Sequence, residues 1–106
     1  MRNKILKFLV TKEVQERGLM VPTGTTVLTV AEQKERMYVW VEMNPEQNCT
    51  CLLELRVIFT GSDVPEGFKH LYSSTRDNWV RHFYYRIDAN PSLRKEEEDA
   101  NNGTGV

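Results

Sequence analysis

The chain has no apolar run of the length that crosses a membrane, which takes about 20 consecutive residues in a helix. Its first apolar cluster, residues 5–10, is short and is interrupted by Lys7, so it does not resemble a secretory signal. We therefore expect neither a membrane span nor a cleaved leader. With 106 residues, the chain is expected to form one domain with a single core.

Cysteine and histidine are equally scarce, with two of each. Cys49 and Cys51 would lie roughly 6.6 Å apart on an extended strand and point the same way, which argues against a disulfide and for reduced thiols. Together with His70 and His82 they form a nominal Cys₂His₂ set, but structural zinc sites usually take their cysteines from a knuckle with wider spacing. The sequence predicts no metal site.

Motifs of catalysis are also missing. No serine stands in a nucleophile elbow, and Gly61 and Gly67 belong to no phosphate-binding loop. Glu42 and Glu54 could do acid–base work only if the fold paired them, and nothing in the sequence brings them together. We therefore expect no catalytic residue, no cofactor and no enzymatic activity.

Charge of either sign is not in excess overall, since the formal net charge is −1. Its distribution is uneven, because residues 88–106 carry two positive and five negative side chains. A near-neutral body gives no general electrostatic case for nucleic acid. The sequence predicts a β-rich domain over residues 1–87 and a flexible acidic tail over 88–106, with a short helix from Ser92 as the minority alternative.

The stretch 19–44 organises the rest of the chain. Pro22 and Gly24 favour a turn, and residues 25–30 are dominated by β-branched side chains typical of a strand. Residues 33–36 are polar and form the expected tip of a hairpin. In the returning strand, 37–43, alternation predicts an apolar core face made by Met37, Val39, Val41 and Met43.

Further strands are expected at residues 4–11, 50–60, 68–73 and 79–87, with a polar turn at 74–78. Residues 12–18 suit either a loop or one helical turn. In the strand 50–60 we place Glu54 and Arg56 on a partly solvated side. The fold class is thus all-β, a small antiparallel sandwich or partly open barrel of six to seven strands.

This order of elements resembles a family of short uncharacterised proteins of tailed phages and prophages. The resemblance covers roughly residues 4–85 and has no counterpart for the two cysteines or the acidic tail. It implies a phage origin and a compact β fold, but no reaction. Together with the reduced thiols expected for the two cysteines, a phage origin makes the host cytoplasm the expected location. The segments that carry it are Val21-Pro22-x-Gly24, Val27-Leu28-x-Val30, Val39-Trp40-Val41 before Asn44-Pro45, Ile58-Phe59-Thr60-Gly61, Val64-Pro65 and Trp79-Val80-Arg81-His82-Phe83.

Aromatic and basic side chains mark a candidate binding surface. Such residues stack on nucleotides and are enriched at the centres of protein interfaces, although plain packing accounts for them equally well. His82 in particular would be satisfied by a backbone carbonyl if it were only partly buried. The candidates are Tyr38, Trp40, Trp79, Arg81, His82, Tyr84 and Arg86.

We therefore expect a non-catalytic phage accessory protein, a binding module that interferes with a host or defence component. Its ligand would be a host protein or a small nucleotide signal. A virion or assembly component and a small enzyme are the alternatives. Bulky side chains on both faces of residues 37–43 and 79–87 further predict self-association as a symmetric dimer.

Overall fold

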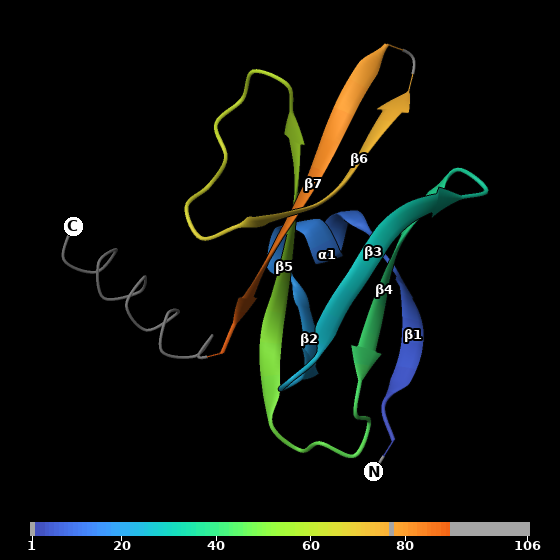
Figure 1. Ribbon diagram of the computed structural model, residues 1–106, viewed down its shortest axis with the longest axis vertical. Coiled ribbons are helices and arrows are strands. Elements are labelled where there is room, and N and C mark those ends of the chain that lie inside the picture. The colour runs from blue at the N-terminus through green and yellow to red at the C-terminus, as the bar shows by residue number, and fades with distance from the viewer. Residues whose placement is uncertain (1, 77, 90–106) are drawn as a thin grey trace, which may run out of the picture.

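The computed structural model describes residues 2–76 and 78–89, which form seven strands and one short helix (Figure 1). The all-β expectation is confirmed. The elements in chain order are β1 (Lys4–Leu9), α1 (Lys12–Arg17), β2 (Leu19–Pro22), β3 (Thr26–Gln33), β4 (Arg36–Met43), β5 (Thr50–Phe59), β6 (Lys69–Arg76) and β7 (Trp79–Asp88).

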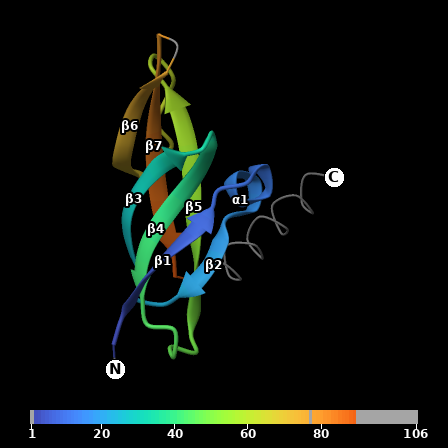
Figure 2. The same cartoon turned by 90° about the vertical axis from the view of Figure 1, so that its right-hand side faces the viewer.

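The strands form two antiparallel sheets, one of three strands in the order β1-β4-β3 and one of four in the order β2-β5-β7-β6. They pack as an open sandwich, with β3 and β4 over β5 and β7, while α1 lies beside β5 at the edge where β2 pairs with it (Figure 2). We call the face of the four-stranded sheet that is turned away from the three-stranded sheet its outer face. The turn at Thr23 and Gly24 takes the chain from one sheet to the other.

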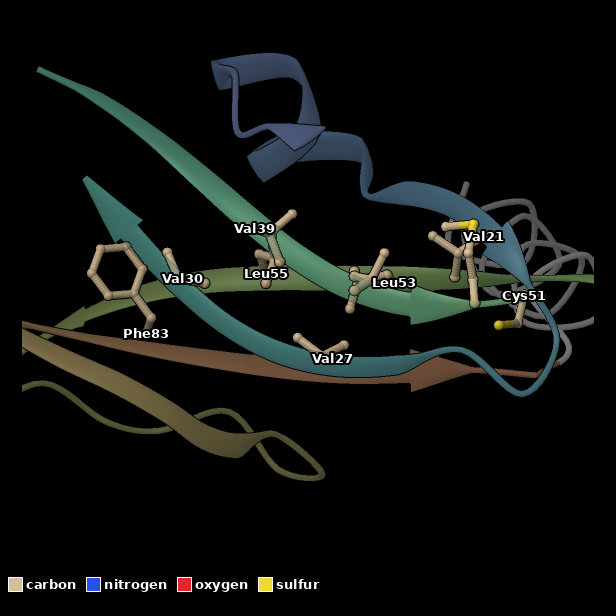
Figure 3. Packing of buried hydrophobic residues seen from close by; sticks show 10 residues of the cluster. Val21, Val27, Val30, Val39, Cys51, Leu53, Leu55 and Phe83 are labelled. Atoms are coloured by element: carbon tan, nitrogen blue, oxygen red, sulfur yellow. The ribbon is translucent and has the colours of Figure 1, made fainter. Parts of the chain in front are cut away.

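The core fills the space between the two sheets (Figure 3). The expected core face of β4 is confirmed, because Val39 and Val41 are fully buried and Met43 nearly so. From the other sheet, one valine of β2, alternate residues of β5 and one aromatic of β7 complete the core. Its buried apolar members are Val21, Val27, Val30, Val39, Val41, Met43, Cys51, Leu53, Leu55 and Phe83.

Glu54 differs from the expectation, since it is buried with 6% of its surface exposed rather than partly solvated. Its register partner on β7 is Arg86, whose guanidinium Nε donates to the Glu54 carboxylate at 2.6 Å. The alternation of side chains places Glu54 on the correct side of the strand. It carries no information about Arg86, because that partner lies on a neighbouring strand that is distant in sequence.

Two local expectations are decided by hydrogen bonds. Residues 12–17 form a helix, because the Thr11 hydroxyl accepts from the Val14 N–H at 3.1 Å and caps the first turn. The polar turn expected at 74–78 is wrong, since β6 pairs with β7 as far as Arg76 opposite Trp79. A polar edge strand is easily taken for a turn, because neither of its faces needs to be apolar.

The tail expected at 88–106 lies, apart from Asp88 and Ala89, outside the described residues. Within residues 2–76 and 78–89, no helix is long and apolar enough to cross a membrane.

Candidate functional site

Polar and aromatic side chains meet on the outer face of the four-stranded sheet, near the end of β5. In the strand register, His82 of β7 lies opposite Ile58 of β5 on one side and opposite Ser73 of β6 on the other. Since side chains alternate along a strand, His82, Tyr84 and Arg86 of β7 share this face. The central strand therefore contributes a histidine that lies between Ile58 of β5 and Ser73 of β6.

Four of these residues form a hydrogen-bonded chain, which we call the histidine network: Thr60, His70, Ser73 and His82. Ser73 Oγ lies 2.7 Å from His70 Nε2 and 2.7 Å from His82 Nδ1. The second ring nitrogen of His82, Nε2, lies 3.1 Å from Thr60 Oγ1. Each imidazole thus has a nitrogen directed at the same hydroxyl oxygen.

A break in the β6–β7 register makes this arrangement possible. His70 and Ser73 are three positions apart, so in a regular strand their side chains would point to opposite faces. The register shifts between His70 and Tyr72, and a bulge of this kind re-aims the side chains on one side of it. The ring of Tyr84 then packs against the His70 ring, with 5.4 Å between centroids and 74° between planes.

Next to His82 the surface is hollowed into a shallow depression of about 220 Å³, open to solvent. It lies between the end of β5, the loop that follows and β7. Apolar and hydroxyl side chains line it together, so it offers an apolar surface with polar groups at one side. The lining residues are Ile58, Phe59, Thr60, Gly61, Ser62, Val64, His82 and Tyr84.

Arginines on the outer face are engaged within the protein. Arg86 pairs with Glu54 and its guanidinium lies 4.6 Å from the centre of the Phe68 ring. The Arg56 guanidinium lies 5.4 Å from the centre of the same ring and donates to the carbonyls of Gln15 and Leu55. These contacts fix the end of the 60–68 loop and join α1 to the sheet.

Arg81 points to the inner side of the sheet, where it forms an ion pair with Glu32 at the end of β3. Arg76 of β6 approaches the same carboxylate at 3.5 Å. This cluster connects the two sheets beyond the apolar core, which gives Arg81 a structural role.

The remaining predicted aromatics lie on two other surfaces. Tyr38 and Trp40 are half-buried on the three-stranded sheet, where the Lys7 ammonium lies 4.5 Å from the Tyr38 ring centre and 6.0 Å from that of Trp40. Trp79, at the start of β7, is 67% exposed and packs edge-on against Phe59 with 6.4 Å between centroids. Of the seven predicted binding residues, the structure thus brings together His82, Tyr84 and Arg86.

Sequence reasoning missed His70, Ser73 and Thr60 as partners of His82. The signal available was the polar character of residues 69–76, which indicates an exposed strand as well as a turn. Only the register with β7 shows which of those polar residues meets the histidine, and the bulge alters that register.

The four residues of the nominal zinc set do not converge. Cys51 faces the core and its thiol donates to the Pro22 carbonyl at 3.7 Å, whereas both histidines lie on the outer face. Burial, with a smaller contribution from the Asp88 carboxylate, raises the pKa of the Cys51 thiol. Cys49 is exposed in the loop before β5. The part of the chain that the structure describes holds no group of three or more histidine, cysteine or acidic side chains that could bind a metal ion.

Comparison with known proteins places this domain by sequence. A family model described as a domain of unknown function (DUF7352) matches residues 1–94. No curated protein and no solved structure matches the chain. Because the family model spans most of the sequence, the chain belongs to the DUF7352 family.

Proposed function

We propose that the protein is a non-catalytic binding module that takes a protein partner at the end of the four-stranded sheet. The contact surface, which we call the distal surface, consists of Phe59 and Val64, which line the depression, and of Trp79, which packs on Phe59. These side chains are 45%, 46% and 67% exposed. Phe59 lines the depression and also packs on Trp79, so Phe59 connects the indole to the depression.

The exposure of Trp79, packed against Phe59, is the observation that carries the proposal. Large exposed apolar patches on small domains mark interaction sites, and tryptophan leads the residues that anchor protein interfaces. Packing of Phe59 against Trp79 holds the indole in place before binding, which reduces the entropy lost when a partner orders it. The depression beside it has room for an apolar side chain of the partner.

Size and charge favour a protein over a small nucleotide signal. Small-molecule sites usually enclose roughly 300–1,000 Å³, and this depression is smaller and open. A nucleotide would also need cations for its phosphates. Arg56 and Arg86 already bind acceptors and the Phe68 ring, and Arg81 is paired with Glu32.

The resemblance to short phage and prophage proteins supplies the biological setting of the proposal. In that setting the domain acts in the host cytoplasm and interferes with a host or defence protein. The absence of catalytic motifs from the sequence supports a role through binding alone. A small nucleotide signal, a virion or assembly role and an enzymatic role then become outcomes of the test.

The test is affinity capture from host lysate followed by measurement with the purified partner. We expect Trp79→Ala to weaken binding by about 2 kcal/mol or more, which is the loss that defines an interface anchor. Met20→Ala is the matched control, because Met20 is 54% exposed on β2, away from the distal surface, and it should bind like the wild type.

Three results would contradict the proposal. Equal binding by Trp79→Ala and Met20→Ala would place the contact elsewhere. A nucleotide in the bound fraction, with no host protein captured, would favour the small-signal alternative. Co-sedimentation of the domain with phage particles would favour the structural one.

A further inference from the structure

We propose that His70 and His82 form a binding site for one borderline divalent transition-metal ion such as Cu²⁺ or Zn²⁺. Neutral imidazole is the commonest protein ligand for these ions. Both rings are on the outer face, where solvent can fill the coordination positions that the protein leaves open. The inference stands apart from the proposed function, since it uses neither Trp79 nor Phe59.

The geometry of the histidine network carries the proposal. His70 Nε2 and His82 Nδ1 each lie 2.7 Å from Ser73 Oγ, so the two nitrogens are directed at one point and are separated by no more than twice that distance. Bonds from zinc to imidazole nitrogen measure about 2.0–2.1 Å. A small rotation of the exposed His70 ring and the half-buried His82 ring brings both nitrogens to a common ion beside Ser73, whose hydroxyl can turn toward the ion or toward water.

The residues behind the two rings resemble the support that metal-binding histidines receive. Coordination through Nδ1 requires that His82 carry its proton on Nε2, and this N–H can then donate to Thr60 Oγ1 at 3.1 Å. Outer partners of this kind fix the tautomer and the orientation of the ring. The Tyr84 ring packs edge-on against His70 and restricts the plane of the other imidazole.

This site differs from the four-ligand zinc set that the sequence argues against. Cys49 and Cys51 take no part in it, and Cys51 is on the opposite side of the sheet. Because the ion binds at the surface of an already folded sheet, removing it with a chelator should leave the domain folded and lower the thermal midpoint only by the amount that ion binding adds. The site is therefore a binding site on the folded domain and not a structural centre.

Titration of the full chain with Cu²⁺, followed by electron paramagnetic resonance, tests the proposal. We expect one equivalent of copper coordinated by two imidazole nitrogens. His70→Ala and His82→Ala should each leave one nitrogen in the spectrum and lower the affinity at least about tenfold, within the range known for perturbed metal sites. Zn²⁺ should compete for the same site.

Two further variants separate coordination from a merely structural effect. Thr60→Val removes the acceptor of the His82 N–H without removing a ligand, so it should weaken copper binding while keeping a two-nitrogen spectrum. Cys49→Ser should bind copper like the wild type. Unchanged affinity in both histidine variants, or loss of the site in Cys49→Ser, would overturn the proposal. Paramagnetic broadening in the wild-type nuclear magnetic resonance spectrum that is centred elsewhere and leaves the signals of His70 and His82 sharp would do the same.

Discussion

At the scale of single residues, the pair of Glu54 and Arg86 is the most consequential polar contact. The Glu54 side chain is only 8% exposed and that of Arg86 26%. A charge in such surroundings is tolerated because an opposite charge and hydrogen bonds compensate its lost hydration. The pair thereby fixes which residue of β7 lies opposite which residue of β5.

Arg86→Met keeps most of the packing against Phe68 but removes the cation. We expect it to lower the free energy of unfolding by about 2 kcal/mol, less than the roughly 3–5 kcal/mol found for breaking fully buried pairs, because Arg86 is partly solvated. Arg17→Met is the control, since its ion pair with Glu13 is 79% and 74% exposed and should contribute less than about 0.5 kcal/mol. Equal losses in urea denaturation would refute this account.

The two cysteines should differ in reactivity. Cys49 is exposed and should react readily with a thiol reagent, whereas Cys51 should be protected, because burial raises its pKa and the thiolate is the reactive form. As pH rises past about 9, the unfolded chain ionises Cys51 before the folded one does. The contribution of the protonated Cys51 thiol to the free energy of unfolding is thus complete below that pH and falls above it. Cys51→Ala should therefore flatten this part of the pH profile of the free energy of unfolding. Two thiols labelled at one rate would contradict the expectation.

At the scale of elements, the helix α1 is joined to β2 through Gly18. Its φ is +82°, and an added Cβ would lie 2.8 Å from Leu52 Cδ1 and 2.9 Å from the Leu53 carbonyl. Gly24, in the turn between the sheets, has φ +88° but nothing within 4 Å of such a Cβ. The two glycines therefore share a positive φ and differ in the space around them.

We expect Gly24→Ala to cost about 1 kcal/mol of stability, the scale of left-handed backbone strain alone. Gly18→Ala should cost clearly more, because the backbone carbonyl of Leu53 cannot yield without disturbing the centre of the sheet. Thermal denaturation of both variants measures the difference. A milder effect at position 18 would show that α1 is not held closely against β5.

The strands themselves were largely predictable from alternation, and the core face of β4 was correct to the residue. What alternation could not give was any property that depends on a neighbour distant in sequence. Burial of Glu54 depends on Arg86, and the histidine network depends on the bulge beside His70. The candidate site was accordingly predicted only in part, through His82, Tyr84 and Arg86. A bulge changes the face to which side chains point, and it leaves no distinct pattern in a single sequence.

At the scale of the whole molecule, the outer side of the three-stranded sheet leaves Tyr38 and Trp40 half-buried beneath Lys7, with Ile5 61% exposed nearby on β1. The expected two-fold dimer would cover this face. We predict dimers in sedimentation at about 100 μM, a concentration at which even weak contacts populate. Trp40→Ala should shift the chain to monomer, and Trp79→Ala should leave the dimer intact. A wild-type monomer at that concentration would refute the prediction.

The pairing of β1 with β4 and of β2 with β5 also has a kinetic consequence. The β3–β4 and β6–β7 ladders join neighbouring segments and can form within microseconds, but the N-terminal strands must wait for partners made much later in the chain. Such non-local closure slows β proteins to milliseconds or seconds. During that interval the unpaired edges of β4 and β5 are open to the N-terminal arm of another copy, so newly made chains at high concentration can exchange arms before each closes on itself.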